Sequence, residues 1–325
     1  MAELKPNQKK TLKYLLIGFA CFFVFINAIA FFHAWNFSHF NPNATKRVNG
    51  NKMSVGQKIS AMFFGVDMPR PVNDSLPTLP YETITLQSNR QIECWYIKAD
   101  SAIGTVALFH GYGGAKSSML QRGYYLHSLG YNLLLADFMG SGGSEGNATT
   151  IGLLEGAQVK TCVDYLVKRG DNNICLFGTS MGAASILKAI DTEQLPVQSL
   201  ILECPFGTMT QAVDNRFKLM GVPAFPMAKL LMFWGCVQTG CNLFTHSPAN
   251  YAKKVKVPTL LLWGEQDDKV NREEIDAIYN NLAGPKRLIT YPNARHESYL
   301  NKYSSEWQSD VAGFLATTKP LTNTP

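Results

Sequence analysis

One serine in this chain stands in a setting that suits nucleophilic catalysis. The run Gly178-Thr179-Ser180-Met181-Gly182 follows a short apolar stretch, Ile174 to Phe177, and opens a segment of helical period, Met181 to Ile190. A serine on a sharp turn between a strand and a helix projects its hydroxyl, and glycines on both sides let the neighbouring backbone pack closely. The spacing therefore predicts that Ser180 is an exposed nucleophile at the end of a strand.

A serine hydroxyl is a poor nucleophile at neutral pH. It needs an imidazole within hydrogen-bond reach, and a carboxylate that orients the imidazole. Asp267 and Asp268 follow the apolar stretch Thr259 to Trp263, and His296 follows the next such stretch. Because the carboxyl ends of parallel strands meet at one edge of a sheet, we expect His296 and one of the aspartates to meet Ser180 there.

The segments that must position these residues alternate between two patterns. Thr83 to Gln87 and Ile92 to Lys98 have the period-two alternation of half-buried strands, which predicts a hairpin. Short apolar runs, typical of strands buried on both faces, then alternate with segments of helical period. The apolar runs are Thr105–Phe109, Asn132–Ala136, Ile174–Phe177, Leu200–Leu202, Thr259–Trp263 and Leu288–Tyr291. The helical segments are Ser117–Leu129, Ile151–Lys168, Met181–Ile190, Arg272–Leu282 and Ser304–Ala316. This alternation predicts an α/β fold of about eight strands in a mostly parallel sheet flanked by helices.

One interval lacks strand-like runs. From Pro205 to Val257 the chain is rich in Phe, Met, Trp, Gly and Pro. The interval predicts a helical lid at about residues 205–256, with an overlong crossover loop as the alternative. Its aromatic residues favour an apolar acyl or alkyl substrate, and they equally suit a lid packed onto the core.

With these motifs in place, residues from about Tyr81 to Ala316 resemble the α/β-hydrolase fold of serine esterases and lipases. The run Gly264-Glu265-Gln266-Asp267-Asp268-Lys269-Val270 resembles the acid loop of that family, Gly-x-x-Asp-x-x-Val. The resemblance implies that Asp267 is the acid, with Asp268 as the alternative.

A second loop resembles the oxyanion loop of the same family. It is the run His110-Gly111-Tyr112-Gly113-Gly114, and the resemblance implies that the backbone N–H groups of Tyr112 and Met181 hold the developing negative oxygen. The run from Asp137 to Gly146 is similar to a structural loop of the family, so no catalytic role is expected there. The family often has glycine before the catalytic histidine, where this chain has Arg295.

The N-terminal part contains the most hydrophobic stretch of the chain. Leu15 to Phe32 are eighteen residues, twelve of them Leu, Ile, Phe or Val, with Asn27 as the only strongly polar interruption. Tyr14 and Trp35 bracket the stretch, and twenty-two helical residues at about 1.5 Å each span about 33 Å, close to a bilayer. Residues 14–35 are therefore predicted to be a transmembrane anchor. The alternatives are a signal peptide cleaved at the Ala-x-Ala pair before Phe31, which leaves a secreted protein, and a buried core helix.

Flanking charges predict an orientation. Four lysines precede the apolar stretch, and no Lys or Arg lies within ten residues after Trp35. The positive-inside rule then makes residues 1–13 a cytoplasmic basic tail and places the rest outside the cytoplasm. Residues 36–80 are expected to be a tether and lead-in with little chemistry. Residues 81–318 are expected to form the hydrolase domain, and residues 319–325 a short tail.

Composition excludes several classes of function. The 30 basic and 24 acidic residues, a net charge of +6, are dispersed without a run of five like charges, which argues against nucleic acid as a partner. The seven cysteines lack zinc or redox spacing, and their odd number excludes a fully paired disulfide framework. Cys236 and Cys241 remain candidates for one small disulfide loop in an oxidising compartment. The histidines lack metal-ligand spacing. We therefore expect no metal and no organic cofactor.

Together these features predict a membrane-tethered serine hydrolase. The expected reaction is that of a carboxylesterase, which cleaves ester or thioester bonds of a small or lipid-like acyl substrate through an acyl-enzyme. Two alternatives remain open: a peptidase or amidase that uses the same residues, and a non-catalytic membrane-tethered binding protein.

Overall fold

The computed structural model describes residues 5–44 and 53–318. The start of the predicted basic tail (1–4), part of the tether (45–52) and the predicted C-terminal tail (319–325) lie outside the described residues.

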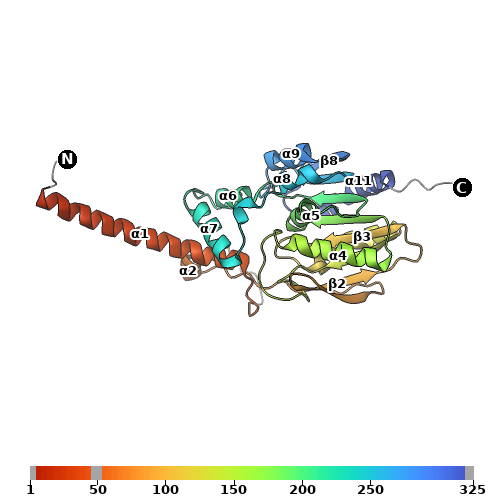
Figure 1. Ribbon diagram of the computed structural model, residues 1–325, viewed down its shortest axis with the longest axis horizontal. Helices are drawn as coiled ribbons and strands as arrows, with labels where there is room; N and C mark the ends of the chain where they lie inside the picture. The colour runs from red at the N-terminus through yellow and green to blue at the C-terminus, as the bar shows by residue number, and fades with distance from the viewer. Residues whose placement is uncertain (1–4, 45–52, 319–325) are drawn as a thin grey trace.

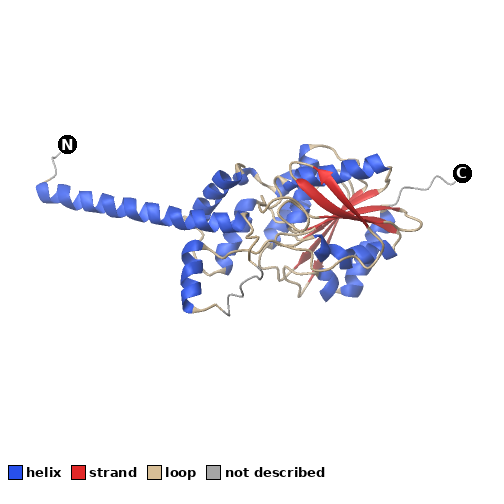
Figure 2. Ribbon diagram, turned by 90° about the horizontal axis from the view of Figure 1, so that it is seen from below, coloured by secondary structure: helices blue, strands red, loops and turns tan. Residues whose placement is uncertain are grey.

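A single eight-stranded sheet forms the centre of the domain (Figures 1 and 2). Its strands are β1 Glu82–Gln87, β2 Gln91–Ile97, β3 Gly104–Phe109, β4 Tyr131–Ala136, β5 Ile174–Thr179, β6 Ser199–Glu203, β7 Thr259–Gly264 and β8 Lys286–Tyr291. The spatial order is β1-β2-β4-β3-β5-β6-β7-β8. β1 and β2 form an antiparallel hairpin, β2 pairs antiparallel with β4, and the remaining neighbours are parallel. The predicted hairpin and mostly parallel sheet are confirmed.

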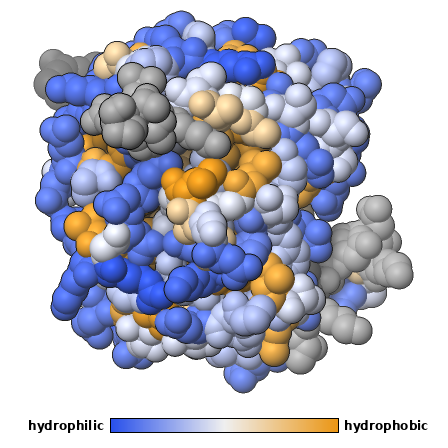
Figure 3. Space-filling view, turned by 90° about the vertical axis from the view of Figure 1, so that its right-hand side faces the viewer, coloured by the Kyte–Doolittle hydropathy of each residue, from blue (hydrophilic) through white to orange (hydrophobic). Residues whose placement is uncertain are grey.

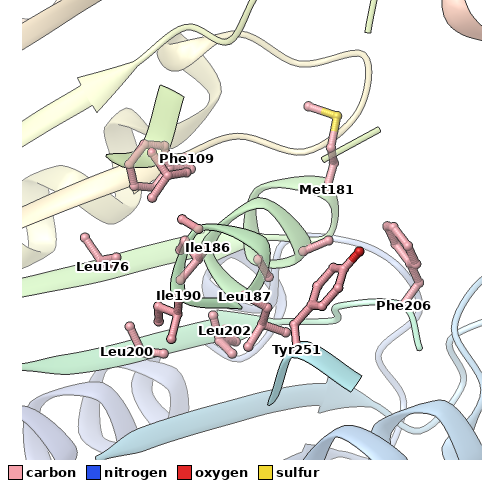
Figure 4. Close-up of a cluster of buried hydrophobic side chains, with 14 of the residues drawn as sticks. Phe109, Leu176, Met181, Ile186, Leu187, Ile190, Leu200, Leu202, Phe206 and Tyr251 are labelled. Carbon is pink, nitrogen blue, oxygen red and sulfur yellow. The ribbon is translucent and has the colours of Figure 1, made fainter. Parts of the chain in front are cut away.

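Helices cover both faces of the sheet because its central strands are apolar on both sides. The helices on the two faces are α3 Leu120–Ser128 after the short η2 Lys116–Met119, α4 Glu155–Arg169, α5 Met181–Thr192, α9 Arg272–Asn281, α10 Tyr299–Lys302 and α11 Ser304–Thr317. Leu134 of β4 belongs to the core under α4, α5 and α9, whereas its neighbours Leu133 and Leu135 belong to the core under α3 and α11. In Figure 4, Ile190 and Leu187 of α5 lie over Leu200 and Leu202 of β6.

The interval between β6 and β7 is helical, as predicted. It contains α6 Met209–Leu219, α7 Met227–Thr239, η3 Leu243–Thr245, α8 Pro248–Tyr251 and η4 Ala252–Lys254. Glu274 of α9 fastens the start of this lid, because its buried carboxylate accepts the N–H of Gly207 at 2.8 Å and the Asn215 amide at 2.7 Å. The lid thus rests on the carboxyl edge of the sheet.

The N-terminal residues form a long helix, α1 Pro6–Ser38, which extends away from the domain (Figure 1), and a short helix, α2 Val55–Phe64. By length and composition α1 can cross a membrane, and only 6% of its most apolar window is buried. The helix continues to Ser38, so the first residues of the expected tether form its last turn.

The lead-in to the sheet is also better packed than expected. The Arg70 guanidinium donates to the carbonyl oxygens of Gly142, Ser144 and Gly146, and Phe40 is buried. This segment holds the end of α1 against the domain.

Candidate active site

Ser180 lies on a strained turn between β5 and α5. Its backbone has φ 50° and ψ −110°, and its N–H donates to the carbonyl oxygen of Glu203 at the end of β6, at 2.7 Å. The flanking glycines are required: a Cβ at Gly182 would lie 2.3 Å from the carbonyl oxygen of Phe109, and one at Gly178 would lie 2.5 Å from the nitrogen of Ala183. The predicted strand–turn–helix setting is present, and the turn aims the hydroxyl away from the sheet.

The structure brings the predicted histidine and acid to this serine. His296 Nε2 lies 3.1 Å from Ser180 Oγ, and His296 Nδ1 lies 2.8 Å from Asp267 Oδ2. A carboxylate on Nδ1 favours the neutral tautomer with its proton there, so that the Nε2 lone pair faces the hydroxyl. These three side chains therefore form one hydrogen-bonded chain.

The structure distinguishes between the two candidate aspartates. The Asp267 side chain is fully buried, and its Oδ1 accepts the N–H groups of Lys269 at 2.8 Å and Val270 at 2.9 Å. Asp268 is exposed. Asp267 is therefore the carboxylate held against His296.

A small pocket opens beside these residues. It has a volume of about 50 Å³, and both residues of the predicted oxyanion hole, Tyr112 and Met181, line it together with Ser180 and His296. Met181 is the first residue of α5, where backbone N–H groups point out of the helix toward its N-terminal end. Three larger hollows on the described surface have no Ser180, His296 or Asp267 in their linings.

The rest of the pocket lining comes from four parts of the chain. The lid supplies apolar residues and one cation, the acid loop supplies a second cation, α1 supplies Phe37, and the loop before α4 supplies Ile151. These residues are Phe206, Met209, Ala212, Val213 and Arg216 of the lid, and Lys269 and Val270 of the acid loop. The Tyr112 hydroxyl donates to the carbonyl oxygen of Phe37 at 2.9 Å, and the Arg216 guanidinium lies 4.6 Å from the centre of the Phe37 ring.

Comparison with known proteins agrees with the fold described above. Residues 100–243 match the family model described as serine aminopeptidase, S33, and residues 241–321 match the model of the PhoPQ-activated pathogenicity-related protein. The esterase Pf2001 of Pyrococcus furiosus superposes with a TM-score of 0.65 at 23% sequence identity, over 78% of this chain and 100% of that one. The chain has the α/β-hydrolase fold.

Two curated proteins have sequences similar to this chain. The uncharacterized protein YfhR of Escherichia coli K12 is 24% identical over 242 residues, 71% of this chain and 78% of that protein. The lysophosphatidylserine lipase ABHD12 of Xenopus tropicalis is 25% identical over 240 residues, 69% of this chain and 61% of that protein. Together with the family match, these relatives support a hydrolase.

The sequence analysis missed Cys204. This buried residue directly follows β6, and its sulfur lies within 4.8 Å of the facing atoms of Asp267 and His296. The rule that found the other residues, a polar side chain at the carboxyl end of a strand, also applies here. Both ring nitrogens of His296 already have hydrogen-bond partners, Nδ1 with Asp267 and Nε2 with Ser180, so these residues suit proton transfer better than metal binding.

The surroundings of His296 change its acidity. Burial disfavours the charged imidazole, but the Cys204 sulfur and the Asp267 carboxylate outweigh this effect and raise the pKa of His296 above its usual value. A base with a raised pKa takes up the proton of an attacking hydroxyl more readily.

The other loops have structural roles. His110 is buried, burial lowers its pKa, and its Nε2 accepts the N–H of Phe138 at 3.1 Å. The buried Asp137 carboxylate pairs with the Lys116 ammonium and accepts the N–H of Gly143 at 2.9 Å. Arg295 is exposed.

The candidate disulfide is not formed in the structure, where Cys236 and Cys241 are both free and half-buried thiols.

Proposed function

We propose that this protein is a membrane-tethered serine hydrolase that cleaves carboxylic ester or thioester bonds through an acyl-enzyme at Ser180. The observation that carries the proposal is the hydrogen-bonded chain from Ser180 Oγ through His296 to Asp267, at the edge of a pocket.

Each residue has a role in the proposed reaction. Ser180 Oγ attacks the carbonyl carbon while His296 Nε2 takes the hydroxyl proton, and Asp267 orients the ring and stabilises the imidazolium. The N–H groups of Tyr112 and Met181 hold the negative oxygen of the tetrahedral intermediate. His296 then gives the proton to the leaving oxygen or sulfur, and a water molecule repeats the cycle on the acyl-enzyme.

A peptidase is the second candidate, because the matched family model is described as a serine aminopeptidase. An aminopeptidase must bind the ammonium group of its substrate. Among the described residues that line the pocket are the cations Arg216 and Lys269, and there is no carboxylate. A lining without a carboxylate gives the ammonium group of a peptide no counter-charge, which favours an acyl ester over a peptide substrate.

We also propose that α1 is retained as the anchor, with its N-terminus in the cytoplasm and the hydrolase domain on the other side. Cleavage after Ala30 would cut α1 where it packs against the lid, since Ala30 and Ala34 are buried and Gln238 donates to the carbonyl oxygen of Phe31. The orientation rests on the lysines before the apolar stretch, because positively charged flanks stay on the cytoplasmic side.

Labelling and turnover test this function. Full-length protein in detergent should react with a fluorophosphonate probe and hydrolyse p-nitrophenyl esters faster than aminoacyl arylamides. Ser180→Ala should abolish labelling and lower turnover about 10⁵- to 10⁶-fold, because the hydroxyl is the nucleophile. Ser128→Ala, on the far end of α3, should behave like the wild type. Labelling that persists in Ser180→Ala would refute the assignment of the nucleophile, and faster arylamide turnover would favour the peptidase.

A further inference from the structure

The lid helix α7 packs along the second half of the apolar stretch of α1. Trp234 Nε1 donates to Asn27 Oδ1 at 3.1 Å, and Gln238 Nε2 donates to the carbonyl oxygen of Phe31 at 2.8 Å. The rings of Phe31 and Trp234 also meet edge to face, with centroids 5.3 Å apart. The polar interruption of the anchor is therefore satisfied by the lid.

Helix α2 packs on the same half of α1. His33 Nε2 lies 3.0 Å from the carbonyl oxygen of Met62, and Asn36 Nδ2 donates to the carbonyl oxygen of Phe64 at 2.6 Å. We call residues 55–66 and 219–239 the collar, because these two segments flank α1 where it meets the domain (Figure 1).

The position of these contacts along α1 gives the depth of the collar in the bilayer. Asn27 lies eight residues before Trp35, and at about 1.5 Å per helical residue this is about 12 Å. If Trp35 lies at the membrane boundary, as the bracketing aromatic residues predict, then Trp234 lies about 12 Å inside it. A bilayer that surrounds α1 must therefore also meet α7.

The outer surface of the collar suits that environment. It exposes large apolar side chains on both segments, namely Ile59, Met62, Met220, Phe225, Phe233 and Val237, and Phe225 is 78% exposed. The end of the domain opposite α1 is different: Figure 3 shows mostly hydrophilic residues there, with one apolar group near the centre and smaller ones around it. Exposed apolar side chains concentrated beside a membrane helix indicate contact with lipid.

The charge of the collar indicates which lipid. No Asp or Glu occurs between Glu3 and Asp67, or between Asp214 and Glu265. The exposed cations of the collar and its border are Lys58, Lys218 and Lys229. Lysines around an exposed apolar surface attract anionic headgroups.

We propose that the collar is immersed beside α1 in the headgroup and upper acyl layer of an anionic bilayer, and that the pocket draws its acyl ester from that leaflet. Phe37, which lines the pocket, lies two residues or about 3 Å beyond Trp35, so the reacting groups lie at the bilayer surface. The second half of this proposal rests on the proposed function, whereas the first half does not.

Immersion is tested with the full-length protein in vesicles of phosphatidylcholine and phosphatidylglycerol. An environment-sensitive fluorophore is attached at Val237→Cys in a background with Cys21, Cys236 and Cys241 each replaced by Ser, because these are the described cysteines that are not buried. The matched control is Val167→Cys, because Val167 and Val237 are both exposed and both lie two residues before the end of their helix. The probe at 237 should be quenched by lipids with spin-labelled acyl chains, and the probe at 167 by iodide. Quenching of the probe at 237 by iodide alone would overturn the proposal. Protection from both quenchers would also overturn it, because a second copy of the chain would then cover α7.

Access from the leaflet is tested by a ratio of two activities, turnover of a long-chain p-nitrophenyl ester dissolved in the same vesicles against turnover of p-nitrophenyl acetate in water. Phe233→Glu and Val237→Glu should lower this ratio several-fold, and Val167→Glu should not change it. An unchanged ratio in both collar variants would overturn the access proposal. If the wild type hydrolyses neither ester, the proposed function fails instead, and the quenching experiment still decides immersion.

Discussion

The central sheet buries its apolar residues, whereas the layer formed by α1, α2 and α7 exposes many of its own. Every residue of β3, β4 and β7 is buried, whereas the outer layer exposes large apolar side chains along its length. Leu261 of β7 is 0% exposed and Phe225 is 78% exposed. The sheet is stabilised within the protein itself, while the outer layer needs an apolar environment from elsewhere.

The same two regions also supply different parts of the candidate site. The side chains that we propose to react, Ser180, Asp267 and His296, follow the ends of β5, β7 and β8, so the rigid sheet sets their geometry. The walls around them come largely from the lid and from α1. The two regions meet where the Tyr112 hydroxyl bonds to Phe37. Substitutions on either side of that contact should therefore have different consequences.

The largest effect is expected at the sheet edge. Asp267→Asn should lower kcat about 10⁴-fold, because an amide favours the wrong tautomer of His296. Asp268→Asn should change kcat only a few-fold, because Asp268 is exposed. Steady-state turnover of p-nitrophenyl acetate measures both variants, and a greater loss in Asp268→Asn would reverse the assignment of the acid.

The next effect separates the stability of the two regions. Leu261→Ala removes a fully buried side chain and should lower the free energy of unfolding by about 2 to 5 kcal/mol. Val237→Ala on the collar should change it by less than about 0.5 kcal/mol. Urea unfolding in detergent, followed by tryptophan fluorescence, measures both changes. Equal losses would mean that the collar surface is part of the protein core.

A smaller effect is expected at the contact between the regions. Phe37→Ala removes one wall of a pocket of about 50 Å³ and should change the ratio of long-chain to acetyl ester turnover about tenfold. The control is Phe32→Ala, one of the exposed phenylalanines of α1. A chain-length series of p-nitrophenyl esters measures the ratio, and an equal response of the two variants would show that Phe37 does not shape the pocket.

The smallest effect is a change of pH dependence. His296 acts as a base only when neutral, so activity should rise with pH, with a midpoint above about 6.5 because its pKa is raised. Cys204→Ala removes one cause of that rise and should move the midpoint down. Cys175→Ala, another buried thiol, should leave the midpoint in place. The pH profile of kcat/KM tests this, and an unmoved midpoint in Cys204→Ala would contradict the role of the sulfur.

Much of the fold was predictable because its signals are local. Buried strands are short apolar runs, and Ser180, Asp267 and His296 each follow one, so a rule about strand ends is enough to predict that they meet. The ends of the helices were harder to place, since α4 begins four residues after its predicted start, beyond a buried loop around Thr150.

Two residues of the site were missed for different reasons. Phe37 has no local signal in the sequence, and Cys204 has a simpler structural interpretation. Phe37 is one aromatic residue among many in and around the apolar helix α1, and nothing nearby in the chain indicates that it reaches the pocket. Cys204 does follow a strand, but a buried cysteine usually packs as a small apolar residue.

The amino-acid sequence by itself determined the strands, the serine turn, the acid loop and the apolar helix, because each depends on side chains a few positions apart. Only the tertiary structure decided that α1 forms a wall of the pocket and that α7 reaches Asn27, because the contacts that do so join residues 75 and 207 positions apart. No local sequence pattern predicts contacts between residues so far apart in the chain. These contacts depend on how the lid and the sheet edge pack around the end of α1.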